Sequence, residues 1–261
     1  MRILAKCLLC CLLLACGSDD ETLPSIQVEQ AAVITNNYVQ CGSFSQTADE
    51  ALPRSLSAPS DWVVMGSSSA VGAGASTFGN SWVGLLQTDE LAEDVRFHNI
   101  ARGGYATYQS LSSSCVVAPS RRQPDPEHNI DLALSLGADL VILSFPSNDA
   151  ALGYAASETA ANILLLRQQL ADKNAALLVL SSQPRNMEKD KQALLKEMNA
   201  LLAPVLTDCF VDVYDALVGP DGGLSPQYDA GDGVHLNDIG HALVFEEVKS
   251  SLQSKRCVDT L

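Results

Sequence analysis

Apolar runs with the length of buried β-strands alternate along this chain with stretches that have the spacing of amphipathic helices. Strands are expected at residues 62–66, 95–101, 138–145, 175–181 and 209–214. Helices are expected at residues 81–91, 127–136, 157–172, 188–202 and 239–252. Strands that alternate with helices form βαβ units, so the pattern predicts an α/β fold whose five-stranded parallel sheet is covered by helices on both faces. Such sheets bind ligands beyond the carboxyl ends of their strands.

The first fifteen residues have the layout of a secretory signal. Arg2 and Lys6 precede an apolar stretch that is too short to span a bilayer. The stretch ends in Leu13-Leu14-Ala15-Cys16, which resembles a bacterial lipobox, and Cys16 is therefore the predicted lipidation site. The alternatives are an ordinary signal cut at small residues and an uncleaved anchor. We expect an exported protein, tethered by its N-terminal lipid to the periplasmic or cell-surface side of the bacterial cell envelope.

The net charge of the chain limits the classes of molecule that it can bind. The formal net charge is −15 over 261 residues, and no basic cluster interrupts the acidic sequence. This balance argues against nucleic acid as a partner and leaves contact with the membrane to the lipid anchor. Residues 16–57 are polar and irregular and are predicted to form a tether. Residues 58–261 fit one domain of ordinary α/β size.

The cysteines that follow the predicted signal indicate disulfides. Besides Cys16, residues Cys41, Cys115, Cys209 and Cys257 remain, which allows two disulfides in three connectivities. Cys209 opens an expected strand and Cys257 follows the last expected helix, so these two are expected to be neighbours. We favour the pairs Cys41–Cys115 and Cys209–Cys257, with free buried thiols as the alternative. No Cys-x-x-Cys pair occurs after the signal, and no metal site is predicted.

Two polar motifs suit nucleophilic catalysis. The first expected strand breaks into Gly66-Ser67-Ser68-Ser69, which would deliver a hydroxyl to the carboxyl edge of the sheet. Near the end of the chain lies Asp232-Gly233-Val234-His235. A carboxylate three residues before a histidine can orient the ring while the ring takes a proton from the hydroxyl. The motifs predict a serine hydrolase whose acid and base share one loop, with Asp229 as an alternative to Asp232.

These motifs resemble those of the SGNH hydrolases, also called the GDSL family, and the resemblance spans about residues 60–250. The serine block is similar to the family's Gly-Asp-Ser-Leu, with Ser67 in the place of the aspartate. The resemblance implies Ser68 as nucleophile and its main-chain N–H as an oxyanion donor, with Ser67 and Ser69 as alternative nucleophiles. It also implies a flavodoxin-like three-layer α/β/α sandwich that cleaves esters and thioesters, and His235 as general base with Asp232 as its orienting acid.

Two further blocks carry the resemblance. Asn99-Ile100-Ala101-Arg102-Gly103-Gly104 resembles the family's Asn-x-Gly-x-x-Gly, with Ala101 for the first glycine. It implies the main-chain N–H of Gly104 as the second oxyanion donor. Phe145-Pro146-Ser147-Asn148-Asp149 resembles the family's Gly-x-Asn-Asp, with Pro146 for the glycine. It implies the Asn148 amide as the third donor, while Asp149 is expected to hold the loop.

The implied reaction is ester hydrolysis through an acyl-enzyme, without a metal or organic cofactor. The loops expected around the site are small and polar, and Tyr105 and Tyr108 are candidates to stack on a sugar, with plain packing as the alternative. We therefore expect short acyl groups, such as acetyl, on a carbohydrate or other small ester. The alternatives are a lipase, lysophospholipase or thioesterase with an apolar acyl channel, and a non-catalytic glycan-binding surface lipoprotein. The sequence does not indicate an oligomeric state.

Overall fold

A five-stranded parallel sheet forms the centre of the structure. The computed structural model describes residues 34–41, 54–145 and 147–260, which belong to one compact unit, Val33–Leu261. In spatial order the strands are β4 (Val95–Asn99), β3 (Ser60–Gly66), β6 (Leu140–Ser144), β7 (Ala176–Leu180) and β8 (Phe210–Val211). The first of these strands in the chain lies between the second and third, which is the flavodoxin-like order. The predicted α/β fold with five parallel strands is confirmed.

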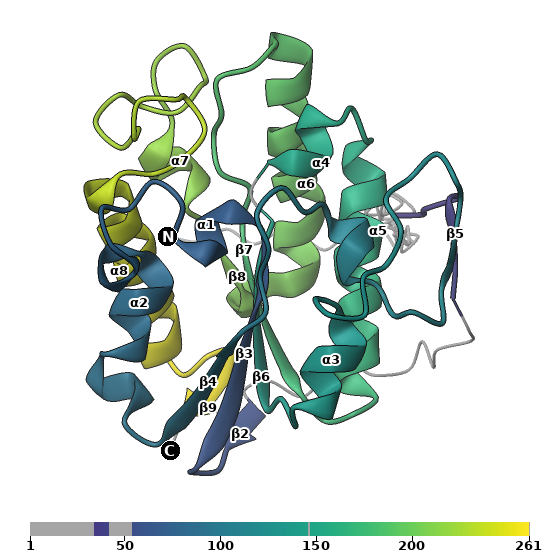
Figure 1. Cartoon of the computed structure of the whole chain (residues 1–261), viewed down its shortest axis with the longest axis vertical. Helices are drawn as coiled ribbons and strands as arrows, with labels where there is room; N and C mark the ends of the chain where they lie inside the picture. The colour runs from purple at the N-terminus through teal and green to yellow at the C-terminus, as the bar shows by residue number, and fades with distance from the viewer. Residues whose placement is uncertain (1–33, 42–53, 146, 261) are drawn as a thin grey trace, which may run out of the picture. The chain divides into compact units, whose positions relative to one another are not determined.

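Helices cover both faces of this sheet (Figure 1). One face is covered by α1 (Ser68–Val71), α2 (Trp82–Gln87) and α8 (Asp238–Gln253). The other is covered by α3 (Ile130–Ser135), α5 (Ala156–Ala171) and α6 (Lys189–Leu206). The short helices are α4 (Asn148–Ala151), α7 (Tyr214–Leu217) and the 3-10 turns η1 (Phe78–Asn80), η2 (Glu90–Ala92), η3 (Thr107–Ser110) and η4 (Thr207–Cys209).

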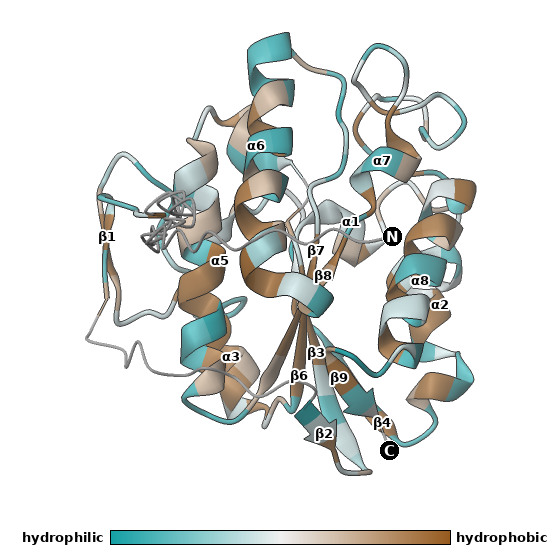
Figure 2. Ribbon diagram, turned by 180° about the vertical axis from the view of Figure 1, so that it is seen from behind, coloured by the Kyte–Doolittle hydropathy of each residue, from teal (hydrophilic) through white to brown (hydrophobic). Residues whose placement is uncertain are grey.

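The alternation of side chains along β3 separates two cores. Trp62 and Val64 pack with residues of α2 and α8, whereas Val63 and Met65 pack with residues of α5. Every residue of β3, β6 and β7 is buried, which explains why these strands read as unbroken apolar runs in the sequence. Figure 2 shows the apolar colour concentrated in the strands, with apolar and polar residues alternating along α6.

Two elements end earlier than their sequence patterns predict. The expected helix at 81–91 stops at Gln87, because the Asp89 carboxylate accepts the main-chain N–H of Leu91 and starts the separate turn η2. The expected strand at 209–214 is confined to Phe210–Val211. Asp212 Oδ1 accepts the main-chain N–H of Tyr214 at 2.9 Å, and this bond turns the chain into α7.

Two small sheets attach flanking segments to the domain. Strand β1 (Val39–Gln40) pairs antiparallel with β5 (Val116–Val117), and β2 (Arg54–Leu56) pairs parallel with β9 (Val258–Thr260). The described parts of the predicted tether, 34–41 and 54–57, thus lie in the compact unit. The predicted signal 1–15, the lipidation site Cys16 and Pro146 lie outside the described residues. Among the residues that are described, no helix is long and apolar enough to cross a membrane.

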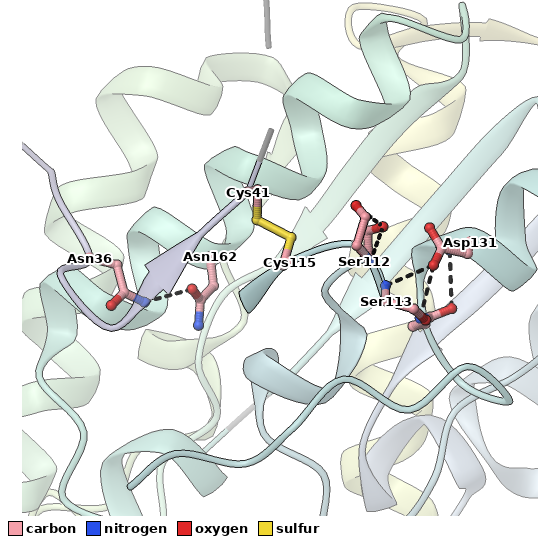
Figure 3. The surroundings of a disulfide bond; sticks show 9 residues. Asn36, Cys41, Ser112, Ser113, Cys115, Asp131 and Asn162 are labelled. Carbon is pink, nitrogen blue, oxygen red and sulfur yellow. Dashed lines mark hydrogen bonds between the residues drawn. A yellow bond between two sulfur atoms is a disulfide. The ribbon is translucent and has the colours of Figure 1, made fainter. Parts of the chain in front are cut away.

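Both predicted disulfides are confirmed. Cys41 is bonded to Cys115, which joins the end of β1 to the start of β5 (Figure 3). Cys209 is bonded to Cys257, which joins the amino end of β8 to the segment after α8. Because Cys257 directly precedes β9, this second bond also fastens the strand with which β2 pairs.

Candidate active site

Ser68 follows a tight turn at the carboxyl end of β3. A side chain at Gly66 would place its Cβ 2.1 Å from the carbonyl oxygen of Ser144, so only glycine fits where β3 passes β6. The main-chain N–H of Ser67 donates to the same carbonyl at 3.0 Å, and α1 begins one residue later. The central strand thereby presents Ser68 at the edge of the sheet where ligands of this fold class bind.

Ser68, His235 and Asp232 form a continuous line of hydrogen bonds. Ser68 Oγ lies 3.0 Å from His235 Nε2, and His235 Nδ1 lies 2.7 Å from Asp232 Oδ2. Asp232 Oδ1 also accepts the main-chain N–H groups of His235 at 2.8 Å and Val234 at 2.9 Å. The bond from the His235 main chain, aided by that from its ring, lowers the pKa of Asp232 to about 2. An ionised Asp232 holds the proton on Nδ1, so Nε2 can accept the Ser68 proton.

Asp229 shapes the turn and does not face the ring of His235. Its Oδ1 accepts the main-chain N–H groups of Gly231, Asp232 and Gly233 at 2.8, 3.1 and 2.9 Å. Of the two candidate acids, it is Asp232 that contacts the imidazole. Asp229 instead supports the backbone that presents Asp232.

The neighbouring serines are buried and have no hydrogen bond to His235 within the described residues. The Ser67 hydroxyl is buried and has no hydrogen-bond partner among the described residues. Ser69 is also buried, on the first turn of α1. Of the three serines in this block, Ser68 is the one whose hydroxyl lies within hydrogen-bond distance of the imidazole.

The loop after β4 brings Gly103 beside Ser68. The main-chain N–H of Arg102 donates to the carbonyl of Gly66 at 3.1 Å and ties this loop to the end of β3. A Cβ at Gly103 would lie 3.9 Å from that of Ser68. Gly104 has φ +81°, which favours glycine, and a Cβ built there would meet nothing within 4 Å. Its N–H has no main-chain acceptor in the described part of the chain.

Asn148 is held on both sides of its amide group. Its Nδ2 donates to the carbonyl of Tyr105 at 2.9 Å, and its Oδ1 accepts from a guanidinium nitrogen of Arg185 at 3.2 Å. One Nδ2 hydrogen remains for a further acceptor.

Sequence reasoning missed Arg185, which lies in the loop after β7. The available signal was its position just after a strand, at the same edge of the sheet as the other blocks.

Asp149 links the Asn148 loop to the Gly104 loop, as predicted. Its carboxylate is buried and accepts from Thr107 twice, from the main-chain N–H at 3.0 Å and from the hydroxyl at 2.6 Å. Burial raises the pKa of Asp149 to about 6, although the bonds from Thr107 oppose this shift. The two predicted oxyanion loops are therefore connected by side chains as well as by the sheet.

The expectation for the two tyrosines is half wrong. Tyr108 is fully buried, and its hydroxyl donates to Glu158, so it cannot stack on a sugar. Tyr105 remains half-buried beside the site, with its hydroxyl bonded to Asp125 and its ring beneath the guanidinium of Arg102.

The other histidines have structural partners. His241 is buried one turn into α8, as expected for a packing residue. Its Nδ1 accepts the main-chain N–H of Trp82 at 3.4 Å, and its Nε2 donates to the carbonyl of Ala73 at 3.1 Å. His98 bonds to Asp61 at 3.0 Å. Nδ1 of His128 lies 2.8 Å from the carbonyl of Ile100.

Comparisons with known proteins show the family of this chain. Residues 64–243 match the model of the GDSL-like lipase/acylhydrolase family. No curated protein is detectably similar in sequence. A GDSL-like lipase from Bacteroides thetaiotaomicron is similar in structure, with 18% sequence identity, 75% of this chain and 89% of that chain covered, and a TM-score of 0.56. An acetyl xylan esterase named AlAXEase has 18% identity, 74% of this chain and 99% of that chain covered, and a TM-score of 0.54. A lipase from a goat rumen metagenome has 15% identity, 74% of this chain and 97% of that chain covered, and a TM-score of 0.55. These identities establish likeness of fold. The family match covers most of the chain, from the strand that precedes Ser68 to the helix that follows His235, and the chain belongs to the GDSL-like lipase/acylhydrolase family of ester-bond hydrolases.

Proposed function

We propose that the protein is a serine esterase that removes short acyl groups, acetyl above all, from carbohydrate. The observation that carries the proposal is the line of hydrogen bonds from Asp232 through His235 to Ser68, with lengths of 2.7 and 3.0 Å. It supplies a nucleophile, a base and an orienting acid within hydrogen-bond reach of one another. In this proposal the main-chain N–H of Gly104 and Asn148 Nδ2, which keeps one hydrogen beyond its bond to Tyr105, serve as oxyanion donors.

In the proposed reaction, His235 Nε2 takes the Ser68 proton as Oγ attacks the ester carbonyl. The negative charge that develops on the carbonyl oxygen is stabilised by the main-chain N–H groups of Ser68 and Gly104 and by Asn148 Nδ2. When the tetrahedral intermediate collapses, His235 gives the proton to the departing alcohol. Water, deprotonated by His235, then attacks the acyl-enzyme and releases Ser68. The Asp232 carboxylate stabilises the imidazolium in both halves.

The openness of the site supports an ester carried on a large polar molecule. The side chains of Asp232 and His235 are 52% and 29% exposed, and the loop at Arg102–Gly104 is exposed. A shallow site can reach an acyl group on the surface of a polymer, whereas a long acyl chain needs an apolar channel. The acetyl xylan esterase that shares this fold fits the same substrate class.

A second candidate, a lipid-directed lipase or lysophospholipase, is favoured by three exposed apolar side chains. Val71 ends the helix that begins at Ser68, Phe78 lies on the following turn, and Ile239 lies four residues after His235. Their side chains offer contact area for an acyl chain or a lipid surface. The goat rumen lipase has the same fold.

The experiment that tests the function is a series of p-nitrophenyl esters from acetate to palmitate, together with acetate release from acetylated xylan. We expect kcat/KM to be greatest for acetate and Ser68→Ala to lower kcat by about 10⁴-fold or more. Ser69→Ala, which removes a neighbouring hydroxyl, is the matched control and should retain most activity. A maximum at long chains would support the lipid-directed candidate. Equal rates for the wild type and Ser68→Ala on every substrate would leave the non-catalytic glycan-binding alternative.

We further propose that the protein is exported and anchored through a lipid on Cys16, with residues 16–57 as the N-terminal segment and 58–261 as the hydrolase domain. Two disulfides support an oxidising compartment. The test is metabolic labelling with a fatty acid in a bacterial host, with Cys16→Ser as control. Label on the Cys16→Ser variant, or none on the wild type, would contradict the lipid anchor.

A further inference from the structure

A short N-terminal segment that precedes the family match packs against the hydrolase domain. This segment, residues 34–41, is here called the arm. Ile34 and Val39 pack against the core that includes residues of α5, and β1 within the arm pairs with β5. Cys41 at its end is bonded to Cys115, as Figure 3 shows. The family match begins at residue 64, so the arm lies outside the matched part of the chain.

The side chain of Asn36 ties the arm to buried polar groups. Its Nδ2 donates to Asn162 Oδ1 at 2.8 Å and to the hydroxyl of Tyr108 at 3.1 Å. Its Oδ1 accepts the main-chain N–H of Tyr38 at 2.9 Å, so both ends of the amide group are engaged. Figure 3 shows Asn36 directed at Asn162, a buried residue of α5.

From Asn162 the hydrogen bonds continue to the active-site loops. Asn162 Nδ2 donates to the hydroxyl of Thr107 at 2.9 Å, and this hydroxyl donates to Asp149 Oδ1 at 2.6 Å. Each bond runs in the same direction, with the donor always on the side of the arm. Thr107 and Asp149 are buried, so neither can replace a lost partner with bulk water.

The line of bonds ends on the two loops that carry the proposed oxyanion donors. Thr107 lies three residues after Gly104, and Asp149 directly follows Asn148. The loops also meet at the bond from Asn148 Nδ2 to the carbonyl of Tyr105. A change in the separation of Thr107 and Asp149 would therefore shift the two proposed donors relative to each other.

A second branch supports the same end of the arm. The hydroxyl of Tyr108 accepts from Asn36 and donates to Glu158, and Glu158 forms an ion pair with Arg121 at 2.7 Å. The guanidinium of Arg121 lies 3.7 Å from the centre of the Tyr38 ring. The arm is thus fixed around Asn36 by a buried acid and a stacked cation as well as by the disulfide.

We propose that the arm positions the oxyanion loops: Asn36, acting through Asn162, Thr107 and Asp149, sets their separation, and the Cys41–Cys115 disulfide keeps Asn36 in place. The inference rests on the proposed function, in which these loops stabilise the transition state. When Asn36 is lost, Asn162 Oδ1 loses its partner, and the bond from Nδ2 to Thr107 alone holds the orientation of the Asn162 amide. Its bond to Thr107 then weakens, and the loops lose their fixed spacing. An error in geometry of this kind lowers kcat more than it changes KM.

The test compares Asn36→Ala with Asn37→Ala, which removes the same side chain from an exposed neighbour in the arm. For p-nitrophenyl acetate we expect Asn36→Ala to lower kcat by roughly 5–20-fold, less than the 10²–10³-fold typical of losing an oxyanion donor outright. KM should stay within about twofold, and Asn37→Ala should match the wild type. Equal kcat values for the two variants, or an effect on KM alone, would overturn the inference.

A second pair of variants probes the middle of the line and guards against misfolding of Asn36→Ala. Thr107→Val removes the hydroxyl at nearly constant volume, and Thr107→Ser restores it. We expect the valine variant to lose kcat and the serine variant to regain most of it. In the double variant Asn36→Ala/Thr107→Val, the loss should be clearly smaller than the product of the two single losses, because both act through the same bonds. Fully multiplicative losses would show that the arm acts by another route.

The wild type and Ser68→Ala are measured first, so that the two proposals fail separately. If these two proteins have the same rate, the serine esterase function is wrong. If they differ but Asn36→Ala behaves as Asn37→Ala does, the esterase function stands and the role of the arm is wrong.

Discussion

Arg185 donates a hydrogen bond to Asn148 Oδ1 at 3.2 Å, from a loop 37 residues further along the chain. A guanidinium has only donors, so it must face the oxygen of the amide and not its nitrogen. The Nδ2 end is thereby directed to the carbonyl of Tyr105. The arginine thus fixes the orientation that an oxyanion donor requires.

Replacing Arg185 should impair the chemical step. We expect Arg185→Ala to lower kcat on p-nitrophenyl acetate by about 10-fold, because Asn148 can then rotate its amide, whereas loss of the donor itself costs about 10²–10³-fold. Arg185→Lys retains a donor and should fall between the alanine variant and the wild type. The control is Arg122→Ala, at an exposed arginine. Wild-type kcat in Arg185→Ala would contradict the orienting role.

The two acids of the histidine loop should be separable by mutation. Asp232→Asn should lower kcat by about 10³–10⁴-fold near neutral pH, because the amide no longer stabilises the imidazolium or fixes its tautomer. Asp229→Asn keeps one oxygen for the N–H groups of the turn and should stay within about 10-fold of wild type. Since the pKa of Asp232 is held to about 2, the carboxylate stays ionised throughout an assay from pH 4 to 9. Comparable losses of kcat in the two variants would show that the geometry of the loop, rather than the contact of Asp232 with the ring, determines the loss.

Asp149 should make stability depend on pH. Burial raises its pKa from 3.8 to about 6, so the folded state binds this proton more tightly than the unfolded state. The stability that comes from the neutral carboxyl group is present below about pH 4 and is lost as the pH rises through about 6. Relative to Asp149→Asn, the wild type should lose about 2–3 kcal/mol of unfolding free energy between pH 4 and 7. Urea denaturation of both proteins at several pH values measures this difference, and a difference independent of pH would refute the assignment.

The two disulfides should affect activity differently. They close loops of 74 and 48 residues, and the chain-entropy model gives each a stabilisation of about 4 kcal/mol. The double variant Cys41→Ser/Cys115→Ser should also lower kcat, because it releases the arm. Cys209→Ser/Cys257→Ser should leave kcat unchanged below its own melting temperature, since Cys209 lies at the amino end of β8, opposite the edge that carries Ser68. Equal effects of the two double variants on kcat would argue against a special role for the arm.

Much of the fold could be predicted because it follows from local patterns. The apolar runs in β3, β6 and β7 are buried on both faces, and such runs are visible without knowledge of their partners. The ends of helices and strands were harder to predict where a single side chain redirects the backbone. Asp89 and Asp212 each accept a main-chain N–H two residues later and end an element that the apolar pattern alone would extend.

The candidate site could be predicted in part. Asp232 and His235 share one loop, and their spacing of three residues already suits the contact between them. Tyr108 was misjudged because an aromatic residue in a polar loop is ambiguous, and only the turn η3 directs it into the core. Arg185 belongs to no motif, since its partner lies on another strand's loop.

By itself the sequence determined the layers of the fold, the blocks at the ends of its strands and the chemistry proposed for Ser68, because these depend on residue type and spacing along the chain. Only the tertiary structure decided which polar groups meet. Asn36 and Asn162 are 126 residues apart, and the direction of their hydrogen bond depends on how α5 packs against the arm. Contacts of this kind depend on how whole helices and strands are placed relative to one another. Burial of the core fixes that placement, and no local sequence pattern encodes it.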